Sequence, residues 1–84
     1  MNEKRKNAVL RHFGHAVRRE RRLQGLSQEA CADLCELDRS YLGGVERGER
    51  SLTLANVVKI CDALKVNVTH MLQELDKWPK QKGP

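Results

Sequence analysis

The stretch GLSQEACADLCELDRSYLGGVERGER, residues 25–50, holds two short helices joined by a very short connection. Ser27 and Asp38 are residue types that cap helices, because their side-chain oxygens accept hydrogen bonds from the unpaired backbone N–H groups of the first turn. These caps predict helices over residues 28–35 and 39–46. Only two residues separate the first helix from the second cap. A connection that short forces a tight angle between the two helices, as in a helix-turn-helix.

Helical patterns continue on both sides of this pair. Ahead of it, apolar residues recur at helical spacing from Val9 to about Gln24, and Gly25 then supplies a stop. Behind it, Thr53 and Asn67 each precede an apolar segment with helical spacing and are expected to cap it. No strand pattern or internal repeat is present. The sequence therefore predicts an all-α fold, a compact five-helix bundle.

The length of 84 residues allows one small domain with a modest core. We expect the domain to span residues 8–76, with its helix-turn-helix at 27–46. Residues 1–7 are polar and basic and are expected to form a flexible arm, or else the start of the first helix. Residues 77–84 hold both prolines and three lysines and are expected to form a flexible tail.

Helical periodicity also predicts the buried residues. They are Ala30, Cys31 and Leu34 in the second helix, Leu42 and Val45 in the third, and Leu54, Val57, Val58, Cys61 and Leu64 in the fourth. The last helix is apolar on two sides, which a domain this thin cannot cover, so it predicts a dimer interface. The interface candidates are Met71, Leu72, Leu75 and Trp78. We favour a mixture in which Val68 and Leu72 point toward the core and Met71, Leu75 or Trp78 are shared with the partner; the alternative is that the apolar residues of this helix only close the core.

The charge of the chain is basic and uneven. Sixteen Lys and Arg stand against eleven Asp and Glu, which gives a formal charge of +5, and four arginines crowd residues 18–22. Such asymmetry indicates a polyanionic partner such as nucleic acid, although for Arg18, Arg19 and Arg22 a solvated helix face is the default interpretation. No apolar run is long enough to span a bilayer, and no signal peptide is present, so we expect a soluble, cytoplasmic protein.

The outer face of the third helix is unusual. Leu42 and Val45 define its buried side, and Ser40, Gly43 and Gly44 fall on the opposite side of the helical wheel. Each interior glycine destabilises a helix by about 1 kcal/mol relative to alanine. We therefore interpret the two glycines as a bare strip that faces away from the core and allows close approach of a ligand.

These residues resemble the Cro and phage-repressor type of helix-turn-helix domain, the Xre-like family, over residues 13 to about 72. The resemblance is carried by Arg21, Leu26–Glu29, Ala32, Val45–Gly48 and the run from Leu54 to Val66. Within that family, residues 38–41, 44–47 and 50–53 look most like the controller proteins of restriction-modification systems. The resemblance implies the lambda-repressor-like fold and a homodimer that binds a near-palindromic, double-stranded DNA operator.

The resemblance also assigns roles to individual residues. Base-edge or groove contacts fall on the third helix and the segment after it: Arg39, Ser40, Tyr41, Gly44 and Arg50. Gln28, at the start of the second helix, matches a phosphate-binding position of the family. Ser51, Thr53 and Asn56 surround the fourth helix cap and are weaker phosphate candidates, because for them the capping role is the favoured interpretation. Arg21 and Glu46 match a buried or half-buried structural ion pair.

Two of these DNA contacts have a second interpretation. Arg39 has the chemistry to read guanine, because a guanidinium can bond O6 and N7 together, and we favour this role; the alternative is that it holds only a phosphate. Tyr41 can pack on a thymine methyl group or a sugar, or simply cover the hydrophobic turn.

The chain departs from the family at two helix ends. The turn after the second helix usually carries glycine where this chain has Glu36, and the stop after the fourth helix usually carries glycine where it has Lys65. We expect positive φ angles at these sites, at about 1 kcal/mol each.

The functional prediction is a transcription regulator, plausible as the controller of a restriction-modification operon. The resemblance alone implies that it recruits or contacts RNA polymerase from one site and blocks it from another, overlapping site. It is expected in the cytoplasm, associated with the nucleoid. A phage-type repressor or antitoxin-type autoregulator is the alternative within the same family, and a protein-binding adaptor of helix-turn-helix shape is the alternative without DNA.

Three other classes of function are disfavoured. Cys31, Cys35 and Cys61 occupy core positions and are expected to be buried thiols rather than zinc ligands with His12, His15 or His70. The histidines have no carboxylate at catalytic spacing, so no enzyme is predicted. No cofactor and no small-molecule ligand are expected.

Overall fold

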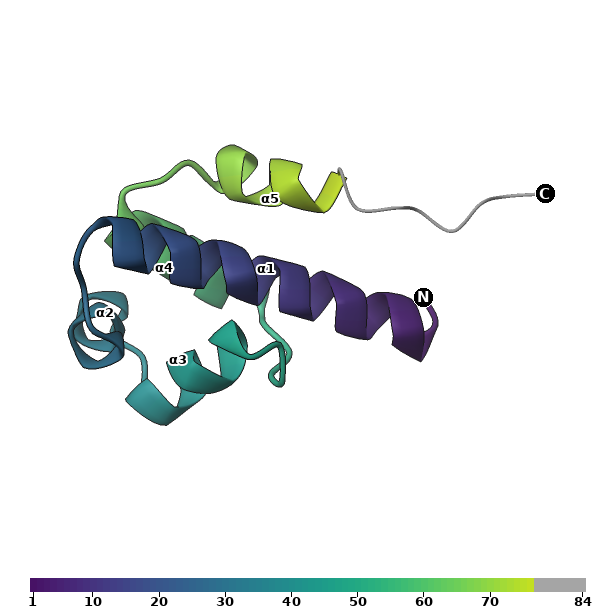
Figure 1. Cartoon of the computed structure of the whole chain (residues 1–84), viewed down its shortest axis with the longest axis horizontal. Coiled ribbons are helices and arrows are strands. Elements are labelled where there is room, and N and C mark those ends of the chain that lie inside the picture. Colours follow the sequence, from purple (N-terminus) through teal and green to yellow (C-terminus); the bar gives the residue numbers. More distant parts are fainter. Residues whose placement is uncertain (77–84) are drawn as a thin grey trace.

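The computed structural model describes residues 1–76, apart from the side chains of Glu74 and Asp76. Five helices make up the fold: α1 (Glu3–Leu23), α2 (Gln28–Cys35), α3 (Arg39–Glu46), α4 (Leu54–Leu64) and α5 (Val68–Asp76). α1 runs through the middle and packs against α3, α4 and α5, while α2 packs against α3 and α4 (Figure 1). The all-α, five-helix prediction is confirmed. The tail at 77–84 and Trp78 lie outside the described residues.

Polar caps set where these helices start. The side chains of Ser27, Asp38 and Thr53 accept hydrogen bonds from the backbone N–H groups of Ala30, Ser40 and Asn56 at 3.0 to 3.1 Å, as predicted. At the N-terminus, Asn2 accepts from the backbone of Arg5 in the same way, so α1 begins at Glu3. Most of the segment expected as a flexible arm is therefore the first turns of α1.

Two helices end in left-handed backbone without glycine. Glu36 has φ 56° and Lys65 has φ 57°, which makes them the C-caps of α2 and α4. Both predictions of positive φ are confirmed. A single left-handed residue at a helix end changes the direction of the chain sharply, which allows the short connection between α2 and α3.

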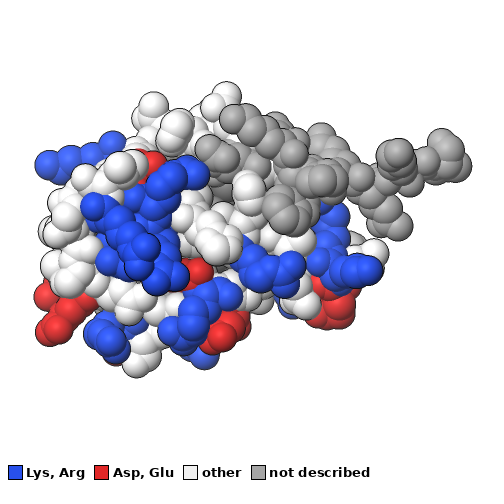
Figure 2. Space-filling view, in the orientation of Figure 1, with Lys and Arg blue, Asp and Glu red and all other residues white. Residues whose placement is uncertain are grey.

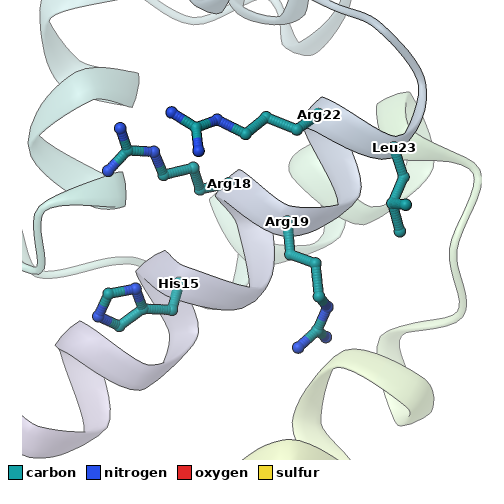
Figure 3. Close-up of a pocket in the computed structure, with 5 residues that line it drawn as sticks. All are labelled: His15, Arg18, Arg19, Arg22 and Leu23. Carbon is teal, nitrogen blue, oxygen red and sulfur yellow. The ribbon is translucent and has the colours of Figure 1, made fainter.

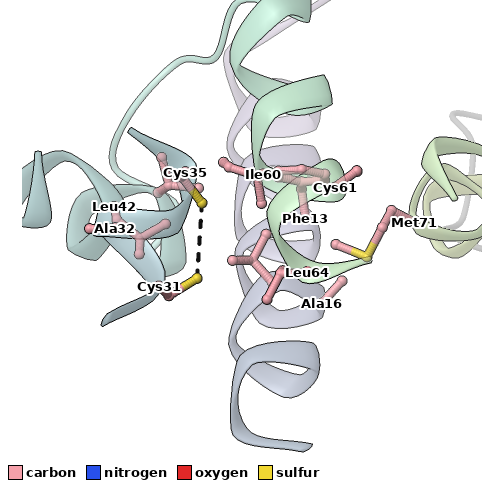
Figure 4. Packing of buried hydrophobic residues seen from close by; sticks show 12 residues of the cluster. Phe13, Ala16, Cys31, Ala32, Cys35, Leu42, Ile60, Cys61, Leu64 and Met71 are labelled. Carbon is pink, nitrogen blue, oxygen red and sulfur yellow. Dashed lines mark hydrogen bonds between the residues drawn. The ribbon is translucent and has the colours of Figure 1, made fainter. Parts of the chain in front are cut away.

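The core lies between α1 and the other helices (Figure 4). It contains the three cysteines, which are buried as predicted, with Leu42 and Val45 of α3. The buried residues of the central cluster are Phe13, Ala16, Val17, Cys31, Ala32, Cys35, Leu42, Val45, Ile60, Cys61, Leu64 and Met71.

Three residues predicted in the core are exposed: Leu34, Leu54 and Val58. In α2 the buried arc runs from Cys31 to Ala32, about 100° apart, and Leu34 lies about 60° beyond its edge. The arc is turned this way because α2 faces both α3 and α4. In α4, likewise, Ile60 lies in the core in place of the two exposed residues.

The last helix is also turned relative to the prediction. Met71 is fully buried, whereas Leu72 is 37% exposed. Met71 therefore closes the core within one subunit and is removed from the dimer-interface candidates. Val68 and Leu75 are partly buried against the cluster.

Candidate nucleic-acid interface

The C-terminal end of α3 is held tightly against α1. Gly14 of α1 is buried at this contact, and a Cβ atom there would clash with the backbone carbonyls of Val45 and Glu46. Only glycine allows so close an approach. The last turn of α3 is thus fixed to the longest helix of the bundle, while its first turn, at Arg39 and Ser40, is exposed.

An ion pair fixes the same end of α3. Arg21 donates from Nε to Oε2 of Glu46 at 2.7 Å and from Nη2 to Oε1 at 3.0 Å. Its Nη1 donates to the carbonyl of Leu26 at 2.8 Å, just before α2. These side chains are buried, and the hydrogen bonds to Glu46 raise the pKa of Arg21. The pair expected from the sequence is present and ties α1, α2 and α3 together.

Gln28, the phosphate candidate at the start of α2, takes part in this network. Its Nε2 donates to Oε1 of Glu46 at 3.1 Å, and the residue is half-buried. This bond uses one of the two N–H donors of the Gln28 amide.

The start of α3 carries exposed polar groups of the predicted interface. Arg39 and Ser40 both lie on the surface, directly after the Asp38 cap. Arg39 is exposed and forms no ion pair or hydrogen bond with any residue from 1 to 76, so none of its five N–H donors is used within this part of the chain. This is the geometry that a base-reading or phosphate-binding arginine needs.

The glycine strip is covered, which corrects the interpretation of a bare face. Gly43 and Gly44 are both buried. A Cβ atom at Gly43 would lie 3.2 Å from Nη1 of Arg47 and 3.6 Å from Oε1 of Gln28. A Cβ atom at Gly44 would lie 2.5 Å from Cγ of Arg50. A helical wheel of α3 alone misses this, because the covering side chains come from α2 and from the segment after α3.

Tyr41 links α3 to the segment that leads into α4. Its hydroxyl donates to the carbonyl of Ser51 at 3.1 Å and accepts from Nδ2 of Asn56 at 3.2 Å. The guanidinium carbon of Arg50 lies 5.3 Å from the centre of the Tyr41 ring, which is a cation–π contact. The structure therefore brings Tyr41, Gly44, Arg50, Ser51 and Asn56 together. Thr53, a further phosphate candidate, caps α4.

Comparison with known proteins bears on this arrangement. Residues 17–70 match the family model described as helix-turn-helix. The chain belongs to the helix-turn-helix family.

Several of its relatives within the family are control or controller proteins. The control protein C.SmaI of Serratia marcescens is 41% identical over 56 residues, which are 67% of each chain. The control protein C.MunI of a Mycoplasma species is 31% identical over 84% of this chain and 97% of that protein. The crystal structure of the restriction-modification controller protein C.AhdI from Aeromonas hydrophila matches with a TM-score of 0.74 at 47% identity, over 76% of this chain and 97% of that one.

This helix-turn-helix protein is accordingly a transcriptional regulator of the restriction-modification controller type, and its matched relatives are regulators rather than enzymes. The resemblance stated from the sequence is confirmed. None of the helices within residues 1–76 is both long and apolar enough to cross a bilayer.

The three cysteine thiols of this helix-turn-helix domain have low reactivity. Burial raises the pKa of Cys31 and of Cys61, and raises that of Cys35 to about 12, with the neighbouring Cys31 adding to the effect on Cys35. The sulfur atoms of Cys31 and Cys35 lie 4.0 Å apart (Figure 4). All three thiols are protonated at neutral pH, and thiolates are the form that binds zinc. No cluster of His, Cys, Asp or Glu in the described part of the chain is arranged to hold a metal ion.

A second basic feature lies on the outer face of α1. An open hollow of about 470 Å³ is lined by His15, Arg18, Arg19, Arg22 and Leu23. Arg18 and Arg22 extend to the same side of the helix (Figure 3). Lys and Arg side chains gather on the face of the molecule that α1 crosses (Figure 2). The buried side of α1 carries Phe13, Val17 and Arg21, so this hollow belongs to the opposite side of that helix.

Proposed function

We propose that this protein regulates a restriction-modification operon as a homodimer that binds a near-palindromic operator, with the start of α3 in the major groove. The observation that carries the proposal is the contrast along α3. Its last turn is fixed by the Arg21–Glu46 pair, whereas its first turn presents the exposed side chain of Arg39, which has no ion pair or hydrogen bond within residues 1–76. A rigid helix with an exposed arginine at its outer end suits base reading.

The surroundings of α3 supply the further contacts. Arg39 and Ser40 are proposed to contact base edges, with Tyr41 and Arg50 along the same groove. The N-termini of α2 and α4 offer unpaired backbone N–H groups to phosphates. We propose the accompanying polar side chains as phosphate ligands: Gln28, Ser51, Thr53 and Asn56.

The dimer is proposed to form through α5. Leu72 is exposed and Leu75 is partly buried, and the adjoining α4 exposes Val58. Large apolar side chains exposed on two packed helices favour contact with a second copy. A twofold dimer would present two α3 helices to successive major grooves, about 34 Å apart.

We propose that the site bound by the dimer decides whether transcription is activated or repressed. Bound at one site, it would contact RNA polymerase and favour initiation; bound at an overlapping site, it would exclude polymerase. The controller type of its relatives supports this scheme. The protein would act in the cytoplasm, at the nucleoid.

Binding-site selection from random duplex DNA tests the proposal. The purified protein is expected to enrich an inverted repeat whose half-sites lie about one helical turn apart. Gel filtration at micromolar concentration is expected to give the mass of a dimer. Failure to enrich any sequence at low or physiological salt would reject operator binding and would favour an adaptor that uses the same fold for protein contacts.

A further inference from the structure

The side chain of Arg50 lies across the surface of α3. Gly44 has no side chain and is nevertheless buried, because the aliphatic part of Arg50 covers it. A Cβ atom built at Gly44 would lie 2.5 Å from Cγ, 3.3 Å from Cδ and 3.8 Å from Cβ of Arg50. No real Cβ atom tolerates the shortest of these distances. Any residue other than glycine at position 44 therefore requires the Arg50 side chain to leave this path.

The charged end of Arg50 rests on Tyr41. Tyr41 and Gly44 are three residues apart in a helix and so share one face of α3. The guanidinium carbon lies 5.3 Å from the centre of the tyrosine ring. The bare backbone at Gly44 and the ring of Tyr41 thus form one continuous surface under Arg50, which we name the arginine seat.

The chain on both sides of Arg50 is tied to the same two residues. The backbone N–H of Glu49 donates to the carbonyl of Gly44 at 2.8 Å. The carbonyl of Ser51 accepts the hydroxyl of Tyr41 at 3.1 Å, and Asn56 donates to that hydroxyl from the first turn of α4. These bonds fix the backbone immediately before and after Arg50, so the direction of its side chain is constrained from both ends.

The guanidinium itself keeps its hydrogen-bonding capacity. Apart from the ring contact, Arg50 has no ion pair or hydrogen bond with the residues that the structure describes. Stacking on a ring leaves the N–H groups in the guanidinium plane free to reach an acceptor. The seat therefore orients Arg50 without consuming its donors.

We propose that Gly44 is a positioning residue for DNA recognition: by leaving room for Arg50 on the Tyr41 ring, it sets which base pair the Arg50 guanidinium reaches. The inference rests on the proposed operator binding. It assigns Gly44 a role through Arg50 rather than through direct approach of DNA to a bare helix. It also explains why a glycine that weakens α3 is useful at this position.

The first test needs no DNA. In the free protein, the Hγ and Hδ protons of Arg50 are expected to be shifted upfield in the NMR spectrum by the Tyr41 ring. Gly44→Ala is expected to return them toward random-coil values. Gly43→Ala is the matched control, because its new Cβ atom meets only the flexible ends of Arg47 and Gln28, and it is expected to leave these shifts unchanged. Unshifted Arg50 protons in the wild type, or shifts that survive Gly44→Ala, would overturn the seat.

The second test compares base preferences by site selection. Gly44→Ala and Arg50→Ala are expected to weaken preference at the same base pair, each by about 10-fold or more. The double variant is expected to lose no more than Arg50→Ala alone, because Gly44 acts through Arg50. Losses that multiply in the double variant, or that fall on different base pairs, would refute the positioning role. If the wild type selects no sequence at all, the proposed function fails, while the NMR experiment still decides whether the seat exists.

Discussion

Arg21 and Glu46 are 25 positions apart in the chain and meet in a buried, two-bond ion pair, with N–O distances of 2.7 and 3.0 Å. The two residues are 8% and 4% exposed. Little water reaches either side chain, so each charge is stabilised mainly by its partner. The ion pair fixes the last turn of α3, the helix that carries the proposed base-reading residues.

Removal of one charge from this pair is expected to destabilise the fold strongly. Glu46→Gln leaves the Arg21 guanidinium buried without a counter-ion and should lower the free energy of unfolding by about 3 to 5 kcal/mol. Chemical denaturation at neutral pH measures this loss. The matched control is Glu49→Gln, because the Arg47–Glu49 pair is also 3.0 Å long but is exposed and should contribute no more than about 1 kcal/mol. Equal losses in the two variants would contradict the argument.

The left-handed helix ends offer a gain in stability. Glu36→Gly and Lys65→Gly should each stabilise the protein by about 1 kcal/mol, because glycine adopts positive φ without steric cost. Gly25 provides the reverse control: it has φ 69° and no heavy atom near the place of a Cβ atom, so Gly25→Ala tests the backbone term alone and should destabilise by a similar amount. Thermal unfolding of the three variants is the measurement. A glycine variant less stable than the wild type would show that Glu36 or Lys65 contributes a compensating interaction.

Features that depend only on neighbours in the chain can be predicted from the sequence. Helix caps, helix ends and positive φ angles are of this kind, as at Ser27, Asp38 and Glu36. The exact buried arc depends on which helices pack on each side, and periodicity alone misplaced Leu34 and Met71. The Arg21–Glu46 pair was expected from family resemblance. The residue pattern of α3 does not predict the contact of Arg50 with Tyr41, because that contact joins the helix to the segment that follows it.

The buried thiols should make stability fall at alkaline pH. Burial raises the pKa of Cys35 to about 12, whereas a thiol in the unfolded chain has a pKa near 8.5. Between these values the folded state keeps a proton that the unfolded state has lost, so stability decreases as pH rises, by about 1.4 kcal/mol per pH unit for one thiol. Urea unfolding at pH 7.5 and 10 is expected to show a smaller loss in Cys35→Ala than in the wild type. Lysine titration is common to both chains and cancels, so identical losses would mean that Cys35 ionises normally.

Arg39 and Arg22 allow the same substitution to be compared on two faces. Both are exposed and unpaired among the described residues, but Arg39 begins α3 whereas Arg22 lines the hollow on the outer face of α1. Arg39→Ala should remove about 1 to 3 kcal/mol of preference at one guanine position while non-specific binding is retained. Arg22→Ala should leave sequence preference unchanged. A uniform loss across all sequences for Arg39→Ala would identify it as a phosphate contact instead.

Substitutions at two adjacent residues of α5 test folding and dimerisation separately. Met71 is fully buried within one subunit, so Met71→Ala should create a cavity and lower the free energy of unfolding by about 2 to 5 kcal/mol. Leu72 is 37% exposed, so Leu72→Lys should preserve the helical circular dichroism spectrum but place a charge in the proposed interface. Sedimentation equilibrium is expected to give a dimer for the wild type and a monomer for Leu72→Lys. Because two α3 helices on one dimer engage both half-sites, the monomer should also bind the selected operator far more weakly at the same protein concentration. If Leu72→Lys remained a dimer and bound the operator with unchanged affinity, the dimer interface would have to lie elsewhere than on this side of α5.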